Sequence, residues 1–264
     1  MELPASPESS FVTVQGRKLE VRTIAGIHRD APVLVFLHEG LGSVSMWRDF
    51  PEKAAQATGC AAMVYSRYGH GQSEVLCEPR AVDYMHVEAL EALPELLGKL
   101  GIAEPILVGH SDGGSIALLY AAVRDGVTGL VLMAPHVFVE DISVKSIAAA
   151  KTAFESTDLP QKLGRHHADA AKTFRGWNDI WLNPDFRGWS IEEHLPRVYC
   201  PVLAIQGFDD EYGTMAQLEA VAKRAGGPVE LLRLADCRHS PHRDQPGVVL
   251  EAMARFIGRL GEGA

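Results

Sequence analysis

The sequence predicts an α/β fold in which a mostly parallel, twisted sheet is flanked by helices. Two observations predict this class: runs rich in Val, Ile and Leu that are too short for helices, and segments of helical spacing between those runs. Strands buried on both faces of a sheet have this continuous apolar character, and their alternation with helices indicates βαβ crossovers. A chain of 264 residues is long enough for one such domain, or for one domain that carries an insertion.

The first element expected is a hairpin. Residues 11–24 alternate apolar and polar side chains around Gly16 and Arg17, which is typical of two strands joined by a tight turn. The buried strands are then expected at 33–37, 61–65, 106–108, 130–133, 202–205 and 229–234, and the helices at 47–57, 82–100, 115–123 and 248–260. Pro94 should kink or divide the second of these helices, because proline lacks the amide proton that the helix ladder requires.

One interval, residues 136–197, breaks the alternation of strand and helix. It contains no good buried strand, and aromatic residues stand among its charged ones: Phe138, Phe154, Phe174, Trp177, Trp181, Phe186 and Trp189. An insertion after the carboxyl end of a strand lies where ligands bind in open α/β sheets. We therefore expect a core domain of residues 1–135 and 198–264 and a helical cap, or lid, of residues 136–197 inserted after the sixth strand. The alternative is a set of surface helices whose tryptophans form a local core.

Composition and charge exclude several classes of function. The net charge is −9 and no run of Lys and Arg appears, whereas a nucleic-acid surface needs clustered positive charge. No stretch approaches the roughly 18 apolar residues of a membrane span, and the first residues lack the basic and then apolar pattern of a signal peptide, so the cytoplasm is the expected compartment. Four cysteines without a CxxC pair predict neither a disulfide framework nor a zinc site, and we expect all of them to be reduced.

The strongest chemical signal is the run Gly109-His110-Ser111-Asp112-Gly113-Gly114. It follows an expected strand and precedes an expected helix, which is the context that a G-x-S-x-G nucleophile elbow requires. The turn is so sharp that side chains at Gly109 and Gly113 would collide with neighbouring backbone. Ser111 would then lie at a helix N-terminus, where free amides and the helix dipole favour negative charge. The alternative is a glycine-rich turn with a capping serine.

A nucleophilic serine needs a general base, and the base needs a carboxylate that orients it. The chain offers two candidates for each role, in the order serine, acid, histidine. Asp209 and Asp210 follow the expected strand 201–206, so both lie just past the carboxyl end of a strand. His239 and His242 lie in a loop near the C-terminus that can reach across to the elbow.

Over essentially its whole length, the chain resembles the α/β-hydrolase superfamily. The matching motifs, in order, are Leu37-His38-Glu39-Gly40, Arg67-Tyr68-Gly69-His70-Gly71-Gln72-Ser73, the elbow, Gly207-Phe208-Asp209-Asp210 and the His239 loop. The resemblance implies the α/β-hydrolase fold with Ser111 as nucleophile. It favours Asp210 as the acid, because the acid of relatives usually falls three residues after the glycine. It favours His239 as the base, because an acidic residue and a proline usually follow that histidine by five and seven residues, as Asp244 and Pro246 do here.

The resemblance also implies an oxyanion hole formed by the backbone amides of Asp112 and Gly40. The chain departs from its relatives at Glu39, where a glycine is usual, and at Asp112, an acid directly after the nucleophile. Both carboxylates can be solvated or paired with Arg67 or His38. If they face the pocket instead, they would repel an anionic substrate and attract an amine or a hydroxyl.

Further candidates for substrate contact are Glu39, Trp47, His136, Trp177 and Trp181. His136 follows the expected strand 130–133 and can either point into the pocket or serve a structural role near the hinge of the lid. Trp47 stands close after the oxyanion loop, and the two lid tryptophans can wall an apolar pocket or belong to a local core. No metal ion or organic cofactor is expected.

The function expected is hydrolysis of a small carboxylic ester, lactone or thioester through an acyl-enzyme. One alternative is carbon–carbon bond hydrolysis of a vinylogous diketone from aromatic ring cleavage, which an arginine or a second polar cluster in the pocket would favour. Another is a non-enzymatic ligand receptor on the same fold. The expected partner is a small-molecule substrate, with neither nucleic acid nor membrane, and a homodimer is left open.

Overall fold

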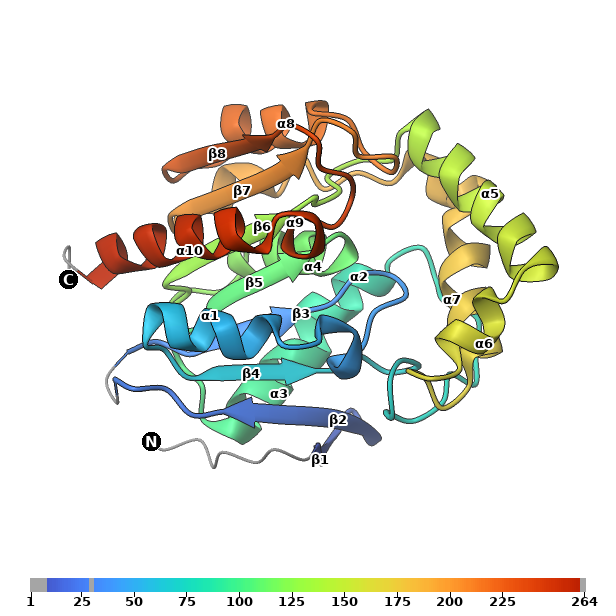
Figure 1. Cartoon of the computed structure of the whole chain (residues 1–264), viewed down its shortest axis with the longest axis horizontal. Coiled ribbons are helices and arrows are strands. Elements are labelled where there is room, and N and C mark those ends of the chain that lie inside the picture. The colour runs from blue at the N-terminus through green and yellow to red at the C-terminus, as the bar shows by residue number, and fades with distance from the viewer. Residues whose placement is uncertain (1–8, 29–30, 262–264) are drawn as a thin grey trace.

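The structure is a computed structural model that describes residues 9–28 and 31–261. Within these residues, a single sheet of eight strands forms the centre of the molecule (Figure 1). The strand order is β1-β2-β4-β3-β5-β6-β7-β8. The strands are β1 Ser10–Val14, β2 Arg17–Ile24, β3 Leu34–Leu37, β4 Ala62–Tyr65, β5 Ile106–His110, β6 Gly129–Met133, β7 Val202–Gly207 and β8 Val229–Leu234. Only β2 runs against the others, so the expected mostly parallel sheet is confirmed.

Helices cover both faces of this sheet (Figure 1). One face carries α1 Phe50–Thr58 and α10 Pro246–Gly261, and the other carries α3 Leu93–Leu100, α4 Asp112–Ala121 and α8 Ala216–Arg224. The side chains of β3 alternate between the two layers: Val35 and Leu37 pack with the α3 and α4 side, whereas Leu34 and Phe36 pack with the α1 and α10 side. Burial on both faces explains why the central strands read as continuous apolar runs.

The hairpin is confirmed, with its turn one residue earlier than expected. Arg17 already pairs with Val14, so Gln15 and Gly16 are the two turn residues. Both have positive φ, 51° and 70°, as the tight turns of hairpins require.

The expected helix 82–100 changes its hydrogen-bond spacing just before Pro94 and stays helical from Tyr84 to Leu100. It consists of α2 Tyr84–Val87, a π-helical turn over Glu88–Ala92, and α3, in which Pro94 stands in the first turn. The first turn of a helix tolerates proline because the amides there need no intrahelical partner. The helix is therefore not divided at Pro94, and the kink that Pro94 predicts stays a prediction.

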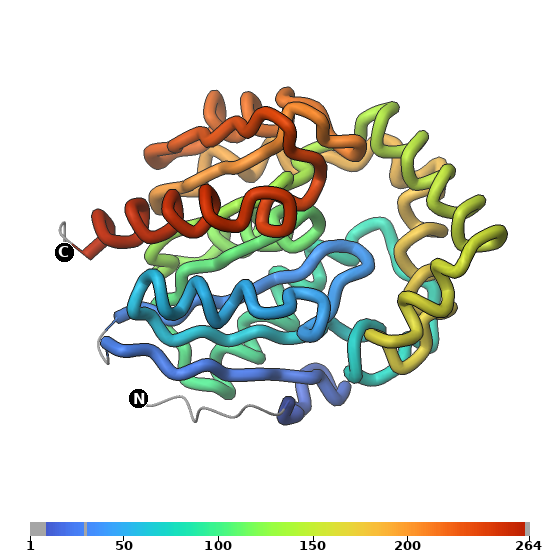
Figure 2. The backbone as a smooth tube through the Cα atoms, in the orientation of Figure 1, coloured from blue at the N-terminus to red at the C-terminus, as the bar shows by residue number. Residues whose placement is uncertain are grey.

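Residues 136–197, which we call the inserted segment, form helices and no strand of the sheet. Its helices are α5 Asp141–Ser156, α6 Leu159–Leu163, α7 Ala170–Trp181, η3 Pro184–Gly188 and η4 Leu195–Arg197. Figures 1 and 2 show α5, α6 and α7 standing beyond the carboxyl ends of the parallel strands, at the right of the view. At the base of the segment, Phe138 and Ser190 form an isolated bridge.

Aromatic rings give the inserted segment a core of its own. Phe186 stacks on Trp189 with ring centroids 5.4 Å apart, and Trp181 packs edge-on against Phe186 at 5.1 Å. Phe154 and Phe174 stack at 4.0 Å. These contacts join α5, α7 and η3, so the aromatic residues of this interval serve local packing as well as any ligand.

Candidate active site

The turn between β5 and α4 has the geometry of a nucleophile elbow. Ser111 stands alone between the two elements with φ 53° and ψ −120°, a strained conformation for a residue with a side chain. A Cβ atom on Gly113 would lie 2.0 Å from the carbonyl oxygen of Leu37, and one on Gly109 would lie 2.4 Å from that of Gly113. The steric need for both glycines, expected from the sequence, is therefore confirmed.

The structure brings His239 to Asp210. Their Nδ1 and Oδ1 atoms are 2.8 Å apart. The same Oδ1 accepts the backbone N–H of Tyr212 at 2.8 Å, and Oδ2 accepts Gln206 Nε2 at 3.1 Å. Asp209, the other carboxylate that the sequence offers, is exposed.

A close backbone approach holds the acid and histidine loops together. A Cβ on Gly207 would lie 1.9 Å from the carbonyl oxygen of Cys237, so only glycine fits at the end of β7. The backbone N–H of Asp209 also donates to that carbonyl, at 3.0 Å. The loops that carry Asp210 and His239 are thus fixed to one another by their main chains.

Asp210 and His239 shift each other's pKa in opposite directions. Burial by itself raises the pKa of Asp210, but the positive charge and hydrogen bond of His239, with the N–H of Tyr212, lower it below the ordinary value. Burial likewise lowers the pKa of His239, but the charge and hydrogen bond of Asp210 raise it above the ordinary 6.5. The carboxylate is therefore ionised and favours a proton on the imidazole beside it.

The other candidate histidine, His242, lies in the core. Its ring packs 4.8 Å from that of Trp47 and 4.8 Å from that of His110, and neither of its ring nitrogens has a hydrogen-bond partner within the described residues. Burial lowers its pKa well below the usual range.

The expectation that Trp47 walls the pocket is wrong. Trp47 is 2% exposed, packs edge-on against Phe36 with ring centroids 5.2 Å apart, and belongs to the layer beneath α1 and α10. The short helix η1 Val44–Trp47 turns this side chain toward the sheet, where its apolar area is covered by α1.

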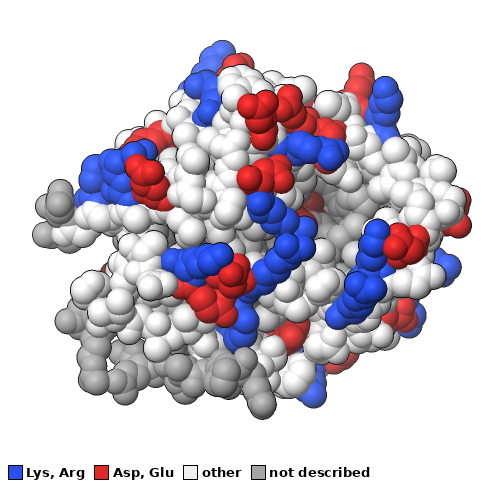
Figure 3. All heavy atoms as spheres, in the orientation of Figure 1, with Lys and Arg blue, Asp and Glu red and all other residues white. Residues whose placement is uncertain are grey.

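A cavity of about 140 Å³ lies beside Ser111. The candidate residues that line it are Glu39, Gly40, Ser111, Asp112, His136, Trp177, Trp181 and His239. The two tryptophans come from α7, so the inserted segment forms one wall and the carboxyl edge of the sheet forms the other. In the space-filling view the surface is hollowed along this boundary (Figure 3).

Two backbone amides on the cavity are free. The N–H groups of Gly40 and Asp112 have no hydrogen-bond partner within the described chain, and both residues line the cavity. A Cβ on Gly40 would lie 2.2 Å from the indole of Trp177, so a larger residue here would have to displace that side chain. Asp112 is the first residue of α4, whose leading amides point toward the elbow.

The two unusual carboxylates each have a partner. Asp112 Oδ2 accepts the Tyr84 hydroxyl at 2.6 Å and lies 3.8 Å from Arg67 Nη2, so the expected pairing with Arg67 is confirmed. Glu39 pairs with Arg243 at 3.3 Å, a partner that the sequence did not indicate. Burial raises the pKa of Glu39, but its contacts with His110 and Arg243 hold that pKa well below the ordinary value.

His136 follows β6 and reaches the cavity next to the candidate base. Its ring lies 5.0 Å from that of Trp181 and 5.7 Å from that of His239, and its buried Nδ1 has no hydrogen-bond partner among the described residues. Burial and the adjacent charge of His239 lower the pKa of His136 to about 4. The ring is thus a neutral polar group on an otherwise apolar wall.

Within the described ranges, no group of three or more His, Cys, Asp or Glu side chains is arranged to hold a metal ion. No helix in the same ranges is long and apolar enough to cross a membrane.

The sequence matches the alpha/beta hydrolase family over residues 34–252. The chain belongs to this family. The matched region runs from β3 into α10 and includes the elbow, the Asp210 loop and the His239 loop.

Within the alpha/beta hydrolase family, known relatives differ in activity. The sn-1-specific diacylglycerol lipase ABHD11 of Mus musculus is 29% identical over 141 residues, which are 53% of this chain and 44% of that protein. The proline iminopeptidase of Lactobacillus delbrueckii subsp. bulgaricus is 28% identical over 228 residues, 71% of this chain and 77% of that one. This chain therefore spans less than half the length of the lipase that it matches.

A solved structure shows the same fold. A hydrolase from Pseudomonas aeruginosa PA01 superposes with a TM-score of 0.76 over 96% of this chain and 99% of that chain, at 19% sequence identity.

Several cavity residues had escaped the sequence reasoning. Ile147 of α5 lines the cavity, but no motif surrounds it in the sequence. Tyr212 also lines the cavity, and its place two residues after Asp210 is a signal in the sequence that could have indicated this. His110 donates from Nε2 to the carbonyl oxygen of His239 at 2.7 Å, so the variable residue of the elbow motif supports the loop of the candidate base.

Substitution of Gly113 tests the elbow geometry. Gly113→Ala should lower the free energy of unfolding by about 1–3 kcal/mol, because the new methyl group must displace the backbone of β3. Gly98→Ala is the matched control: its Cβ would meet nothing within 4 Å in α3, so it should stabilise the protein by up to about 1 kcal/mol. Urea unfolding measures both, and a Gly113→Ala variant as stable as wild type would contradict the close approach.

Proposed function

We propose that this chain is a serine hydrolase that cleaves a small carboxylic ester, lactone or thioester through an acyl-enzyme. The observation that carries the proposal is the convergence on one cavity of a serine in a strained elbow, a histidine paired with a buried aspartate, and two free amides. Membership of the alpha/beta hydrolase family supports the reaction class, and the relatives named a lipase and an iminopeptidase both hydrolyse acyl bonds.

In the first half of the proposed reaction, Ser111 Oγ attacks the substrate carbonyl carbon while His239 Nε2 takes the hydroxyl proton. Asp210 holds the Nδ1 proton and stabilises the imidazolium that forms. The carbonyl oxygen becomes an oxyanion that accepts the N–H groups of Gly40 and Asp112. Each such donor commonly contributes about 10²–10³-fold to the rate.

Bond cleavage and deacylation complete the cycle. The tetrahedral intermediate collapses, the bond to the leaving oxygen or sulfur breaks, and His239 donates its proton to that atom. Water then attacks the acyl-enzyme with His239 as the base, and the products are a carboxylic acid and free Ser111.

The cavity favours a small, largely apolar acyl or leaving group. Its volume of about 140 Å³ is close to that of a cavity that accommodates benzene, about 150 Å³. Ile147, Trp177 and Trp181 supply the apolar wall. In this proposal the inserted segment acts as a lid over the site, as its position beyond the carboxyl ends of the strands supports (Figure 1).

The cavity composition favours ester, lactone or thioester cleavage over carbon–carbon cleavage. Among the described residues that line the cavity, none is an arginine, and the inserted segment contributes His136, Ile147, Trp177 and Trp181. One histidine is neither the arginine nor the second polar cluster that carbon–carbon cleavage of a vinylogous diketone would favour. Turnover of a panel of esters, lactones and thioesters of graded acyl length tests the class and separates an enzyme from a ligand receptor.

The first prediction concerns the nucleophile. A fluorophosphonate probe should label wild type once per chain, because Ser111 lines the cavity together with His239, the proposed base. Ser111→Ala should take up no label, as measured by intact mass. Label that persists in the variant would move the nucleophile to another residue.

The second prediction separates the two neighbouring carboxylates. Asp210→Asn should lower kcat/KM by on the order of 10³-fold or more, because only Asp210 contacts the imidazole. Asp209→Asn, the matched control, should change it little. Equal losses in both variants would contradict the assignment.

The pH profile adds a third prediction. Activity needs neutral His239, so kcat/KM should fall as the pH drops through the pKa of His239. Asp210 raises that pKa. The midpoint of this fall, the acid limb of the profile, should therefore lie above the ordinary pKa of 6.5 in wild type. The residual activity of Asp210→Asn should show a limb at lower pH, because the charge that raised the pKa is gone. A limb that stays in place or moves upward would argue against this coupling.

The fourth prediction concerns substrate charge. Glu39 and Asp112 have partners, so wild type should discriminate little between a neutral ester and a carboxylate-bearing ester of matched size. Arg243→Ala removes the guanidinium beside Glu39 and leaves its contact with His110. Like charges at about 5 Å repel by about 3 kcal/mol at an effective dielectric near 20, which solvent reduces. We expect a selective loss on the anionic ester of about tenfold at low salt.

A double variant is the control for substrate charge. Glu39→Gln combined with Arg243→Ala removes both charges and should restore the wild-type ratio of the two esters. High salt should weaken the discrimination of the single variant. Equal losses on both esters in Arg243→Ala would show that the arginine acts through structure instead of charge.

A further inference from the structure

Three imidazoles hold three successive carbonyl oxygens of the loop after β3. His38 Nδ1 lies 2.7 Å from the oxygen of Glu39, His70 Nε2 lies 3.0 Å from that of Gly40, and His167 Nε2 lies 3.0 Å from that of Leu41. We call residues 39–41 the oxyanion loop. The three histidines come from different places: the end of β3, the loop after β4, and the inserted segment between α6 and α7.

The remaining ring nitrogens assign the direction of these bonds. His38 Nε2 accepts the backbone N–H of Arg67 at 3.0 Å, so its proton is on Nδ1. His167 Nδ1 accepts the backbone N–H of Gly71 at 2.9 Å, so its proton is on Nε2. Each ring is therefore neutral and donates to the loop. A charged imidazolium carries a proton on both nitrogens, so it could not accept the backbone N–H.

His70 follows the same pattern. Its Nε2 lies 3.0 Å from the oxygen of Gly40, which can only accept, whereas its Nδ1 lies between the donor Arg80 Nη2 at 3.3 Å and the oxygen of Tyr68 at 3.2 Å. The proton of His70 is then on Nε2, which donates to Gly40. Burial lowers the pKa of His70 well below the usual range, and it also lowers that of His167.

Fixing these oxygens fixes the amides of the loop. In a trans peptide, the C=O of one residue and the N–H of the next point in opposite directions within one plane. The Glu39 oxygen is held by His38 and also by Arg67 Nη2 at 2.9 Å, so the N–H of Gly40 is turned the other way. The Gly40 oxygen, held by His70, sets the next peptide plane.

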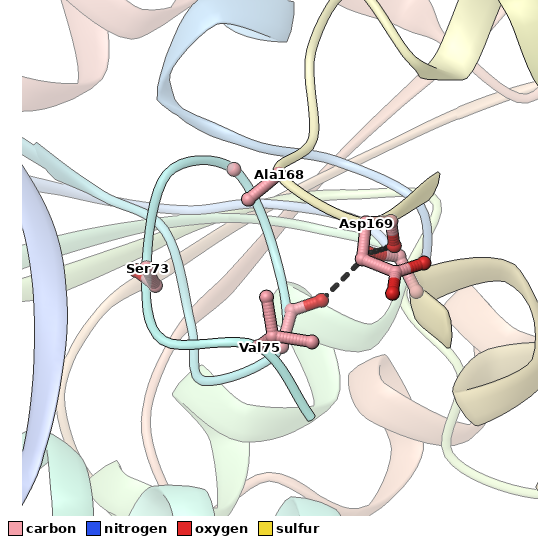
Figure 4. A pocket seen from close by; sticks show the side chains of 7 residues that line it. Ser73, Val75, Ala168 and Asp169 are labelled. Carbon is pink, nitrogen blue, oxygen red and sulfur yellow. Dashed lines mark hydrogen bonds between the residues drawn. The ribbon is translucent and has the colours of Figure 1, made fainter. Parts of the chain in front are cut away.

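The inserted segment also donates hydrogen bonds to the loop after β4, which carries His70. Ala168 N–H donates to the oxygen of Gly71 at 2.8 Å, and the Thr173 hydroxyl donates to that of Gly69 at 2.7 Å. Figure 4 shows this junction, with Ala168 and Asp169 of the inserted segment beside Ser73 and Val75 of the loop after β4.

We propose that His70 and His167 are positioning residues that hold the oxyanion loop in its active geometry, so that the inserted segment contributes to catalysis through His167 as well as covering the site. The proposal rests on the proposed function, since it takes the N–H of Gly40 as an oxyanion donor. It makes the α6–α7 end of the inserted segment a fixed support of the loop.

The test pairs a variant that loses the donor with one that keeps it. His70→Leu and His167→Leu remove the N–H, whereas His70→Gln and His167→Gln retain a side-chain N–H near the position of Nε2. The leucine variants should lower kcat by about 10–100-fold with KM within about twofold, because oxyanion contacts act mainly in the transition state. The glutamine variants should stay within about threefold of wild type. His86→Leu, a histidine outside this network, is the control.

A transition-state analogue gives a second readout. A trifluoromethyl ketone adds to Ser111 and forms a tetrahedral oxyanion, so its inhibition constant should rise in the leucine variants by the same factor by which kcat/KM falls. Leucine variants with unchanged kcat, or glutamine variants as impaired as the leucine ones, would overturn the proposal.

A readout without substrate separates the two proposals. Hydrogen–deuterium exchange of residues 37–44 should be faster in His70→Leu and His167→Leu than in wild type and the glutamine variants. If wild type shows no Ser111-dependent turnover, the proposed function fails, and the exchange rates still decide whether the histidines hold the loop. Unchanged exchange in the leucine variants overturns the positioning role in either case.

Discussion

The close approach of the elbow to the end of β3 is the constraint on which the candidate site depends. Gly113 lies so near the carbonyl oxygens of Leu37 and His38 that no side chain fits between them. The elbow that carries Ser111 and the loop that carries Gly40 therefore keep a fixed separation. The contact of Gly207 with the backbone of Cys237 likewise fixes the separation of the loops that carry Asp210 and His239. Backbone contacts, which cannot relax by rotating a side chain, assemble the reacting groups.

Buried charges around the cavity are balanced by partners from distant parts of the chain. Asp112 and Arg67 are almost fully buried, and a lone charge there would be strongly unfavourable. Arg67 also donates to the oxygens of His38 and Glu39, so one side chain both compensates Asp112 and holds the loop after β3. The acid after the nucleophile is thus part of a structural network, and it leaves the cavity without a large uncompensated negative charge.

The inserted segment has three structural roles that share residues. Its aromatic rings form a local core, Trp177 and Trp181 also wall the cavity, and His167 binds the oxyanion loop. The indole of Trp177 lies directly on Gly40, so cavity wall and loop are in contact. A change in this segment therefore affects the cavity and the loop together, since the same side chains take part in both.

The sequence by itself determined the features that depend on local chemistry. Apolar runs of strand length and the glycines of the elbow are short-range signals, and each led to the element or turn that the structure contains. The residues alone leave two candidates for the acid and two for the base; the resemblance to the α/β-hydrolase superfamily favours Asp210 and His239, and the structure pairs those two residues.

Only the tertiary structure decided contacts between residues far apart in the chain. Trp47 faces the core because α1 covers it, and Glu39 pairs with Arg243, which is 204 residues away. The bond from His167 to Leu41 spans 126 residues. No periodicity or spacing encodes such pairs, because they depend on how the helices and the inserted segment pack against the sheet once it has formed.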